Sequence, residues 1–388
     1  MRQLNNYRQM KHRLPYSVIR LSVIVLLSIQ ISSCKKDIAK DPEQPSVQAS
    51  SQALKQSLGK AEIIVRPGQS IQAAVDAADP NSIIRILPGI YMEAVIVDKP
   101  GMEIVGSEGV IIQNPGDKNN GITVRGNGDG FILRNLTIKD FLRNGVFMIR
   151  ADNYLLSHVT AINDGEYGLY PIFCNNGKME HCEATGHNDS GIYIGQSSDV
   201  EVSYNKTYGN VNGLEIENCA RVTVSQNHCY ENVAGILVVL LPGLTTKTGS
   251  DVIISNNQVN DNNIANFANP GEFESFVPSG TGILIVGSDR TIIENNKVRN
   301  NNFVGIATVS TLVLGALAGL PPEAFADIEP NLDGTRVIKN ILIANGTAAP
   351  PGLPLPAVDL LWDGSGVNNC WSNNQFTTSF PSALPACN

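Results

Sequence analysis

Four side chains suited to proton transfer lie in the middle of the chain, and three of them recur at nearly constant spacing. Tyr170, Tyr193 and Glu215 are separated by 23 and 22 residues, and Glu217 follows two positions later. Residues two positions apart in a strand point to the same face, so the two carboxyl groups would lie about 6.5–7 Å apart. Inverting glycosidases hold their acid and base about 6.5–9.5 Å apart. The spacing therefore indicates paired acid–base chemistry, provided that this stretch is a strand.

A carbohydrate is the ligand that the neighbouring residues favour. Aromatic rings present apolar faces to sugar C–H groups, and rings on successive turns, about 4.8 Å apart, would form a platform for a sugar chain. The other residues predicted to line this platform are Phe147, Tyr167, Gln196 and Asn218. We therefore expect a polysaccharide or another glycan as the partner.

The same acidic residues allow a metal site as an alternative. Ca²⁺ binds several oxygen ligands, most of them from carboxylates. Asp189, Glu215 and Glu217 would supply such oxygens, with Asn218 beside them. Ca²⁺ is therefore the cofactor that this set of residues suggests.

A uronate polysaccharide would use these groups in a lyase or C5-epimerase reaction. Both reactions remove the proton next to the sugar carboxylate, so they need a base and a positive charge that neutralises the carboxylate. Tyr170, Tyr193 or His187 would be the base. Arg150, or Ca²⁺ held by the acidic residues, would neutralise the carboxylate.

Short strands in a repeat of 22 residues must position these side chains. From Gly191 to Asn232 the sequence holds two copies of one pattern. In each copy a glycine opens a strand, a polar turn and a second strand follow, and two asparagines stand five residues apart. The strands alternate in polarity and show no helical periodicity. One repeat cannot bury its own apolar face, so successive repeats must stack.

The pattern extends in both directions and predicts a parallel β-solenoid of roughly ten turns. The asparagines are expected at the bends, where they would bond to the backbone of the next turn. The residues predicted to point into the core are Ile192, Ile194, Leu214, Ile216, Ile236 and Val238. The strand-opening glycines are Gly121, Gly145, Gly168, Gly191, Gly213, Gly235, Gly282 and Gly305.

This repeat resembles the right-handed parallel β-helix of the pectin-lyase-like superfamily. The resemblance rests on Gly-Ile-x-Ile followed by Asn-x-x-x-x-Asn at the repeat period. The stretches GEYGLYPI, SGIYIGQS, GLEIENC and LLWDGSGVNNCW are similar to a bacterial subgroup whose members are often lipoproteins. The resemblance implies an all-β, single-stranded right-handed parallel β-helix and carries no settled biochemical role.

The β-helix domain is predicted to span residues 61–388 and to carry insertions. These lie near residues 241–250, 263–281, 312–332 and 347–358, and the first two border the face formed by the glycine-led strands. The amphipathic stretch Ser70–Ala78 would cap the N-terminal end, because solenoids need caps. Phe303–Leu320 is uncharged but starts inside a repeat, so we expect an apolar loop or end cap rather than a membrane span.

Residues 1–33 form a predicted export signal. Five basic residues accompany an apolar run from Leu21 to Ile31, and small residues precede Cys34. This arrangement resembles a lipoprotein signal whose cleavage leaves Cys34 as the lipidated N-terminus. Residues 34–60 are polar and are expected to form a flexible tether. The sequence thus predicts export to the bacterial cell envelope, with a lipid anchor in the outer membrane on its periplasmic or cell-surface side.

The charge balance disfavours nucleic acid as a partner. The chain has 28 basic and 36 acidic residues, a net charge of −8, and loss of residues 1–33 would make it −13. A chain this acidic repels polyanions unless a metal or a local basic patch intervenes. We expect a monomer that binds a glycan and reaches the membrane through its lipid.

Six cysteines remain besides Cys34, and an exported chain permits disulfides between them. Cys370 and Cys387 both lie in the C-terminal segment, where a bridge would pin the tail. The pairing of the other four stays open.

Non-catalytic functions also remain open. The Asp-Pro-His-Asp motif of mannuronan epimerases and the Asn-Thr-Asp and Gly-His-Gly motifs of polygalacturonases are absent, and His158, His181 and His228 fall on second strands, away from the glycine-led face. The chain would then be a carbohydrate-binding surface module, an accessory protein like the NosD-type β-helices, or a structural spacer. An open groove walled by the insertions would favour catalysis or binding, whereas flat, dispersed side chains would favour a spacer.

Overall fold

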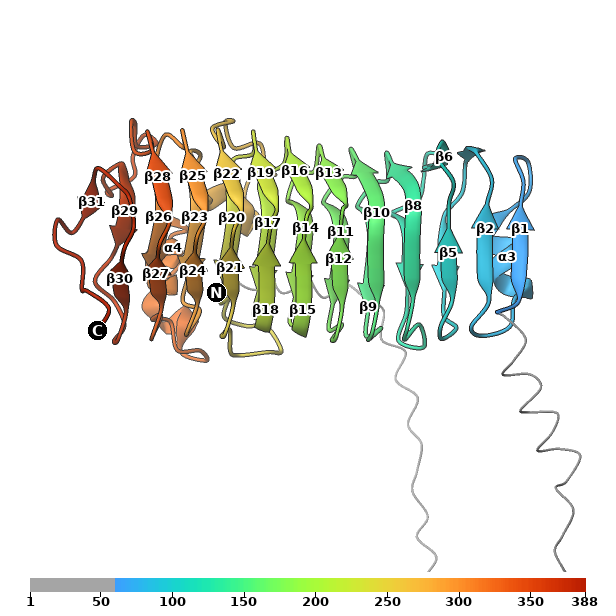
Figure 1. The fold of residues 1–388 in the computed structure, drawn as a ribbon, viewed down its shortest axis with the longest axis horizontal. Helices are drawn as coiled ribbons and strands as arrows, with labels where there is room; N and C mark the ends of the chain where they lie inside the picture. The colour runs from blue at the N-terminus through green and yellow to red at the C-terminus, as the bar shows by residue number, and fades with distance from the viewer. Residues whose placement is uncertain (1–59) are drawn as a thin grey trace, which may run out of the picture.

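The chain folds into a long stack of parallel strands (Figure 1). This computed structural model describes residues 60–388. The predicted export signal, the lipidation site Cys34 and all of the predicted tether except Lys60 lie outside the described residues. Each strand pairs in parallel with strands one turn before and after it, so the stack is a parallel β-helix, as the repeat predicted.

The glycine-led strands form one face, an eleven-stranded sheet. This sheet carries most of the residues singled out for chemistry. Its strands are β4 (Val95–Val97), β7 (Asn120–Val124), β9 (Asn144–Ile149), β11 (Tyr167–Ile172), β14 (Ser190–Gly195), β17 (Asn212–Glu217), β20 (Ala234–Val239), β23 (Thr281–Val286), β26 (Val304–Val309), β29 (Val358–Trp362) and β31 (Ser379–Phe380).

The other two faces join into one twenty-stranded sheet, because β8 (Ile132–Lys139) and β10 (Leu155–Ile162) run round the bend between them. The first of these faces also contains β1 (Glu62–Val65), β2 (Ile83–Ile86), β5 (Glu103–Val105), β12 (Lys178–Glu180), β15 (Ser198–Ser203), β18 (Ala220–Ser225), β21 (Ile253–Ser255), β24 (Ile292–Glu294), β27 (Arg336–Ile338) and β30 (Cys370–Ser372). The second contains β3 (Gly89–Tyr91), β6 (Val110–Gln113), β13 (Glu183–Thr185), β16 (Lys206–Tyr208), β19 (His228–Tyr230), β22 (Gln258–Asn260), β25 (Lys297–Arg299) and β28 (Ile341–Ile343).

Two ladders of asparagines close the bends on either side of the second of these faces. The Asn205 N–H donates to Asn227 Oδ1 at 2.9 Å, and Asn227 Nδ2 donates to the Val202 carbonyl at 2.9 Å. The Asn210 N–H donates in the same way to Asn232 Oδ1 at 3.1 Å. Each asparagine therefore satisfies buried backbone groups of the preceding turn, whereas we had predicted bonds to the next turn.

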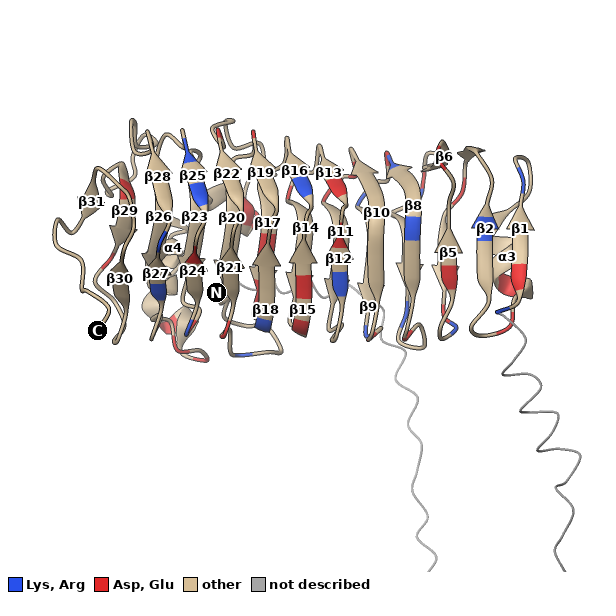
Figure 2. Cartoon of the chain, in the orientation of Figure 1, with Lys and Arg blue, Asp and Glu red and all other residues tan. Residues whose placement is uncertain are grey.

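Apolar side chains fill the space between the three faces. All six residues predicted to point inward belong to the main buried cluster. Charged residues lie on the outside of the strands, as on β12 and β15 (Figure 2), where Lys178 Nζ approaches Glu201 Oε1 at 3.3 Å. The alternation that the repeat predicted is confirmed.

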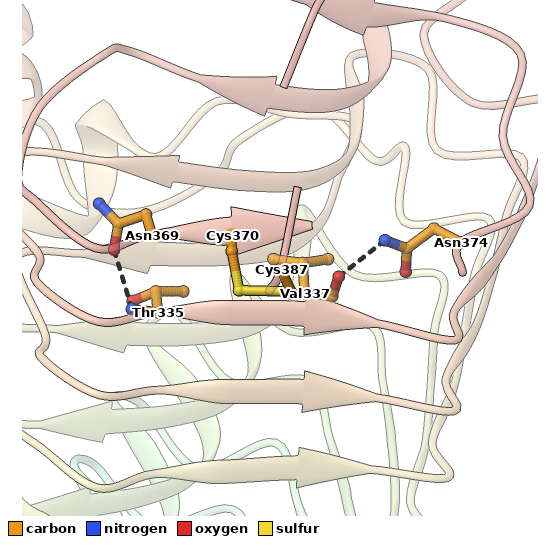
Figure 3. Close-up of a disulfide and its surroundings, with 6 residues drawn as sticks. All are labelled: Thr335, Val337, Asn369, Cys370, Asn374 and Cys387. Atoms are coloured by element: carbon orange, nitrogen blue, oxygen red, sulfur yellow. Dashed lines mark hydrogen bonds between the residues drawn. A yellow bond between two sulfur atoms is a disulfide. The ribbon is translucent and has the colours of Figure 1, made fainter. Parts of the chain in front are cut away.

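Both ends of the stack are covered. At the N-terminal end, α3 (Ile71–Ala77) begins after Ser70, whose Oγ accepts a hydrogen bond from the Ala73 N–H at 3.1 Å. At the C-terminal end, a disulfide joins Cys370 to Cys387 (Figure 3). The same turn is held by hydrogen bonds from the Thr335 N–H to Asn369 Oδ1, at 2.8 Å, and from Asn374 Nδ2 to the Val337 carbonyl, at 2.7 Å.

The insertions contain the remaining helical elements. They are η1 (Phe273–Phe276), α4 (Thr311–Leu317) and η2 (Pro322–Phe325). The apolar stretch predicted as a loop or end cap is instead the strand β26 followed by α4, which Ser310 caps by accepting the Leu312 N–H at 3.2 Å. Leu314 of α4 is buried in an apolar cluster that covers the outer face of the glycine-led sheet. Within residues 60–388, no helix is long and apolar enough to cross a membrane.

Two ionisable residues interrupt the second asparagine ladder. Asp164 and His187 occupy the positions that Asn210 and Asn232 fill in later turns. Asp164 Oδ1 accepts the Phe141 N–H at 2.9 Å, but Oδ2 is buried without a hydrogen-bond partner. Burial raises the pKa of the Asp164 carboxyl well above its usual value. The ionised form of Asp164 is therefore unfavourable at this buried position.

We predict that Asp164→Asn stabilises the protein by about 1 kcal/mol at neutral pH. An asparagine would donate to a backbone carbonyl, as Asn210 Nδ2 donates to the Ala184 carbonyl at 3.1 Å. Because the folded-state pKa of Asp164 is raised, its contribution to stability falls as pH rises from the unfolded-state pKa. The advantage of asparagine should therefore be larger at pH 8 than at pH 4. Urea unfolding at both pH values measures this, and an equal or reversed difference would contradict it.

Candidate functional site

The predicted outward column of side chains exists on the glycine-led sheet. Tyr170 of β11 is paired with Phe147 of β9, and Tyr193 of β14 is paired with Glu215 of β17. Glu217 is paired with Gly195, two positions further along the same two strands. The register thus places the aromatic residues and the acids on adjacent turns.

Pro171 weakens the pairing in the middle of this column. Proline has no N–H to give to the neighbouring strand. Between β11 and β14 the paired positions are Leu169 with Ile192 and Ile172 with Gly195, so the ladder is broken at Tyr170 and Pro171. The local break predicted from the sequence is confirmed.

The aromatic side chains form a cluster rather than a flat platform. We call Phe147, Tyr167, Tyr170 and Tyr193 the aromatic cluster. Tyr170 meets Tyr193 edge to face, with ring centroids 4.6 Å apart and planes at 90°, and its centroid is 5.3 Å from that of Phe147. Tyr167 lies 4.3 Å from Tyr170 and 5.0 Å from Tyr193. The prediction that the rings stack as a flat platform is therefore wrong. Aromatic rings attract each other more strongly edge to face than face to face, because the edge of one ring is positive and the face of the other is negative.

Exposure decreases along the cluster from one end to the other. Phe147 is half-buried, Tyr170 is 7% exposed and Tyr193 is fully buried. Ile149 and Phe173 border the Phe147 end and are also half-buried. A ligand would therefore approach from the Phe147 and Tyr170 end.

Tyr193 and Glu217 form a buried hydrogen-bonded pair. The Tyr193 hydroxyl donates to Glu217 Oε1, and neither side chain is exposed. The Tyr193 ring lies over Gly195, where any larger side chain would collide with the ring. The glycine therefore makes room for the tyrosine to reach the carboxylate of the next turn.

Glu215 belongs to a different set of acidic side chains. Together with Asp189 and Glu274 it forms what we call the carboxylate trio, in which one oxygen from each residue lies within 4.8 Å of the others. All three side chains are buried. Ser190 Oγ lies 2.9 Å from Asp189 Oδ1 and 2.5 Å from Glu215 Oε2. These oxygens are the ones that could hold a cation.

The structure thus separates the two acids that the sequence paired. Glu215 and Glu217 lie on one strand and one face, as predicted, but each has its own set of partners. The predicted metal ligand Glu217 is bonded to Tyr193, and Glu274 completes the trio in its place. Glu274 comes from η1 in the insertion 263–281. The only sequence signal that could have identified it as a candidate ligand is that this insertion borders the glycine-led face.

Gln196 and Asn218 hold the insertion 241–250. The Thr246 N–H donates to Gln196 Oε1 at 2.9 Å. Asn218 accepts the Leu241 N–H at 2.7 Å and donates to the Leu241 and Thr246 carbonyls at 2.8 and 2.7 Å. We predicted that both residues contact the substrate, but these bonds give them a structural role and we do not assign them to a ligand.

His187 is unsuited to act as the base. Its ring is fully buried at a bend, with Nδ1 3.1 Å from the Asp164 carbonyl and Nε2 3.3 Å from the Ala161 carbonyl. Burial lowers the pKa of His187 to about 4. The ring therefore acts as a bend residue, and we leave it out of the chemistry.

Two arginines flank β9. Arg150 follows the strand, is exposed, and places its guanidinium carbon 4.9 Å from the centre of the Phe173 ring. Arg143 precedes the strand and donates to Glu166 at 2.7 and 2.9 Å. Against the effect of burial, Glu166 and, to a smaller extent, Tyr170 and Tyr167 raise the pKa of the Arg143 guanidinium. Sequence reasoning missed Arg143, although its position one residue before a glycine-led strand places it beside the next turn's tyrosines.

The other histidines lie outside this region, as predicted. His158 and His181 are exposed at a bend, where their rings stack at 4.9 Å, and His228 is on β19. The candidate site therefore consists of the aromatic cluster, the Tyr193–Glu217 pair, the carboxylate trio and the two arginines.

Comparisons with known proteins agree with this architecture. A family model described as "Right handed beta helix region" matches residues 120–241. The A-modules of two mannuronan C-5 epimerases from Azotobacter vinelandii have similar structures. For AlgE4 the TM-score is 0.55 at 17% identity, over 83% of this chain and 95% of that module. For AlgE6 it is 0.55 at 15% identity, over 80% and 92%.

A bacteriophage protein has the same fold. The enzymatically active domain of tailspike protein 2 from bacteriophage CBA120 gives a TM-score of 0.54 at 12% identity, over 77% of this chain and 44% of that one. No curated protein matches the sequence. At these identities the similarity concerns the fold alone, and the described chain is a right-handed parallel β-helix with the pectin-lyase-like fold.

We predict that Tyr193→Phe lowers the free energy of unfolding by about 1–3 kcal/mol, because it removes a donor to a buried carboxylate. Tyr208→Phe is the matched control, since its hydroxyl donates to Glu183 Oε1 at 2.7 Å on the outer surface. Water can replace that hydroxyl, so the control should lose less. Urea unfolding of both variants measures the difference, and equal losses would show that the Tyr193 contact is not special.

Proposed function

We propose that the protein binds an acidic polysaccharide at the Phe147 end of the aromatic cluster and transfers a proton on its uronate units. The observation that carries this proposal is the position of Tyr170, between the half-buried Phe147 and the buried Tyr193 and beside Arg143. A phenol at the border between core and solvent, next to a guanidinium, is suited to proton transfer.

Sugar binding would use the partly exposed rings and Arg150. Phe147 and Phe173 offer apolar surface for sugar C–H groups. Arg150 stands over Phe173, so a sugar that packs beside this ring would meet a guanidinium that can pair with its carboxylate. This arrangement favours a uronate over a neutral sugar.

Tyr170 would act as the base. Its phenol would accept the proton at the border between core and solvent, with the Arg143–Glu166 ion pair near it. Tyr193 would act as a positioning residue, because its ring packs against Tyr170 at 90° and Glu217 fixes its hydroxyl. The deeper pair thus sets the orientation of the outer tyrosine.

The proposed step breaks the C5–H bond of a uronate. The proton moves to the Tyr170 oxygen, and the electron pair is delocalised into the sugar carboxylate, which Arg150 neutralises. In an epimerase a solvent proton is then added to the opposite face of C5, and Tyr170 gives its proton to the solvent. In a lyase the C4–O bond breaks instead, a C4–C5 double bond forms, and the departing oxygen takes up a proton.

The comparisons support a polysaccharide as the substrate class. Two of the similar structures are named as mannuronan C-5 epimerases, and the third is named as an enzymatically active tailspike domain. The low identities mean that the proposal rests on the residues described above rather than on these names.

Burial of the deeper acids favours a second candidate function, a non-catalytic polysaccharide-binding module. Tyr193 is fully buried, Glu217 is equally buried, and Glu215 is 1% exposed. None of these side chains reaches a ligand without rearrangement. In this case Phe147 and Arg150 would bind the polymer, and Tyr170 would serve only as packing.

We also propose that the mature protein is exported and anchored in the cell envelope through a lipid on Cys34. The support is the predicted export signal and the small residues before this cysteine. Incorporation of radiolabelled palmitate by the wild type and not by Cys34→Ala would support the anchor, and equal labelling would refute it.

We predict that the protein is retarded by alginate or polygalacturonate in affinity electrophoresis. Phe147→Ala and Arg150→Ala should each weaken retardation at least tenfold, because they remove the apolar contact and the carboxylate partner. Tyr204→Ala is the control, since Tyr204 is 54% exposed on a bend that the proposal does not use. Unchanged retardation in the first two variants would place binding elsewhere.

We predict that Tyr170→Phe retains binding but loses chemistry by more than a hundredfold. The phenylalanine keeps the packing and removes the acceptor of the proton. Absorbance of unsaturated ends reports a lyase, and NMR of the polymer reports an epimerase. Binding without either product in the wild type would select the binding module, and activity retained in Tyr170→Phe would refute the assigned base.

A further inference from the structure

The carboxylate trio brings together three segments that are distant in the sequence. Asp189 precedes β14, Glu215 lies on β17, and Glu274 lies on η1 of the insertion 263–281. The three side chains are 6%, 1% and 4% exposed. One oxygen from each lies within 4.8 Å of the other two. The insertion thus meets the sheet through an acidic group facing two other acidic groups.

Three ionised carboxylates in such a place repel one another strongly. Two unit charges 4 Å apart interact with about 4 kcal/mol at the effective dielectric constant typical of protein sites. A buried charge also loses its hydration. Shared protons or a cation between the three acids would relieve this repulsion.

A nearby amide oxygen supports the cation. Asn212 is fully buried, and its Nδ2 lies 3.4 Å from both Glu215 Oε2 and Ser190 Oγ. Its Oδ1 is buried without a hydrogen-bond partner. A half-turn of the carboxamide exchanges Oδ1 and Nδ2 and directs this oxygen at the trio. A cation would give the amide oxygen the partner that it lacks.

We propose that Asp189, Glu215 and Glu274, with the Asn212 amide oxygen and the Ser190 hydroxyl, bind one Ca²⁺ ion. Ca²⁺ accepts six to eight oxygens at 2.3–2.6 Å in irregular geometry, so two oxygens on opposite sides of one ion are separated by about 4.6–5.2 Å. The spacing within the trio falls inside this limit. Mg²⁺ requires near-ideal octahedral geometry, so this site should prefer Ca²⁺.

The ion would fasten the insertion 263–281 to the glycine-led sheet. Asn266 Nδ2 donates to the Glu274 and Val277 carbonyls at 2.8 and 2.9 Å, so Glu274 stands in a segment that is already internally bonded. Phe273 packs on the apolar cluster beside it. This role is structural and holds whether or not the proposed polysaccharide chemistry occurs.

The test is the calcium dependence of thermal unfolding, measured on the full chain after treatment with EDTA. We expect 1 mM CaCl₂, an amount chosen to exceed a dissociation constant on the order of 10 µM, to raise the Tm of the wild type by several degrees. MgCl₂ should raise it less. Isothermal titration calorimetry should give about one bound Ca²⁺ per chain.

Variants separate this site from weak binding elsewhere. Glu274→Gln and Asn212→Leu should bind Ca²⁺ at least tenfold more weakly and lose most of the Tm response. Glu272→Gln, on the same insertion but outside the trio, should keep both. If the wild type binds no Ca²⁺ and Glu274→Gln melts higher than the wild type, the trio shares protons and the proposal fails. Equal calcium responses in Glu274→Gln and Glu272→Gln would also overturn it. The calcium titration of the wild type tests the proposal even if a variant fails to fold.

Discussion

The fold depends on the satisfaction of buried backbone groups at the bends of each turn. Where the chain turns between faces, a residue with positive φ is followed by an asparagine that bonds backward to the previous turn, as Tyr204 is followed by Asn205 and Gln226 by Asn227. A slip of one residue would leave several of these groups unpaired, at a cost of about 1–3 kcal/mol each. The ladders therefore fix the register over the whole stack.

A fixed register is what brings the candidate site together. Because Tyr193 must face Glu215 across the sheet, side chains 22 residues apart in the sequence become neighbours in space. The same constraint allows insertions to grow from the bends without disturbing the strands, and their apolar and acidic residues then cover the face from β14 onward. Burial of the acids thus follows from the insertions, and the half-buried end of the aromatic cluster lies on turns that precede the insertions.

The sequence predicts which face of a strand each residue occupies, but it does not predict which neighbour the side chain contacts. Periodicity alone placed Ile192, Tyr193 and Glu215 on their correct faces, because strand geometry leaves two choices and the core takes one. It failed for the pairing of Glu215 with Glu217, since the Tyr193 ring leans over Gly195 to reach Glu217. Glu274 was missed because a loop has no period that relates its residues to the sheet.

The measurement that tests the central claim most directly is exchange at C5 of a uronate polymer in D₂O, followed by NMR. In an epimerase C5 regains a deuterium from the solvent, and in a lyase C5 becomes part of a double bond, so the C5–H signal is lost in both reactions. We predict that the wild type abolishes the C5–H signal of the polymer and that Tyr170→Phe, although it binds the polymer, leaves this signal unchanged. A polymer that binds to the wild type and keeps its C5–H signal would contradict the proposed proton transfer and would leave binding as the function of this face.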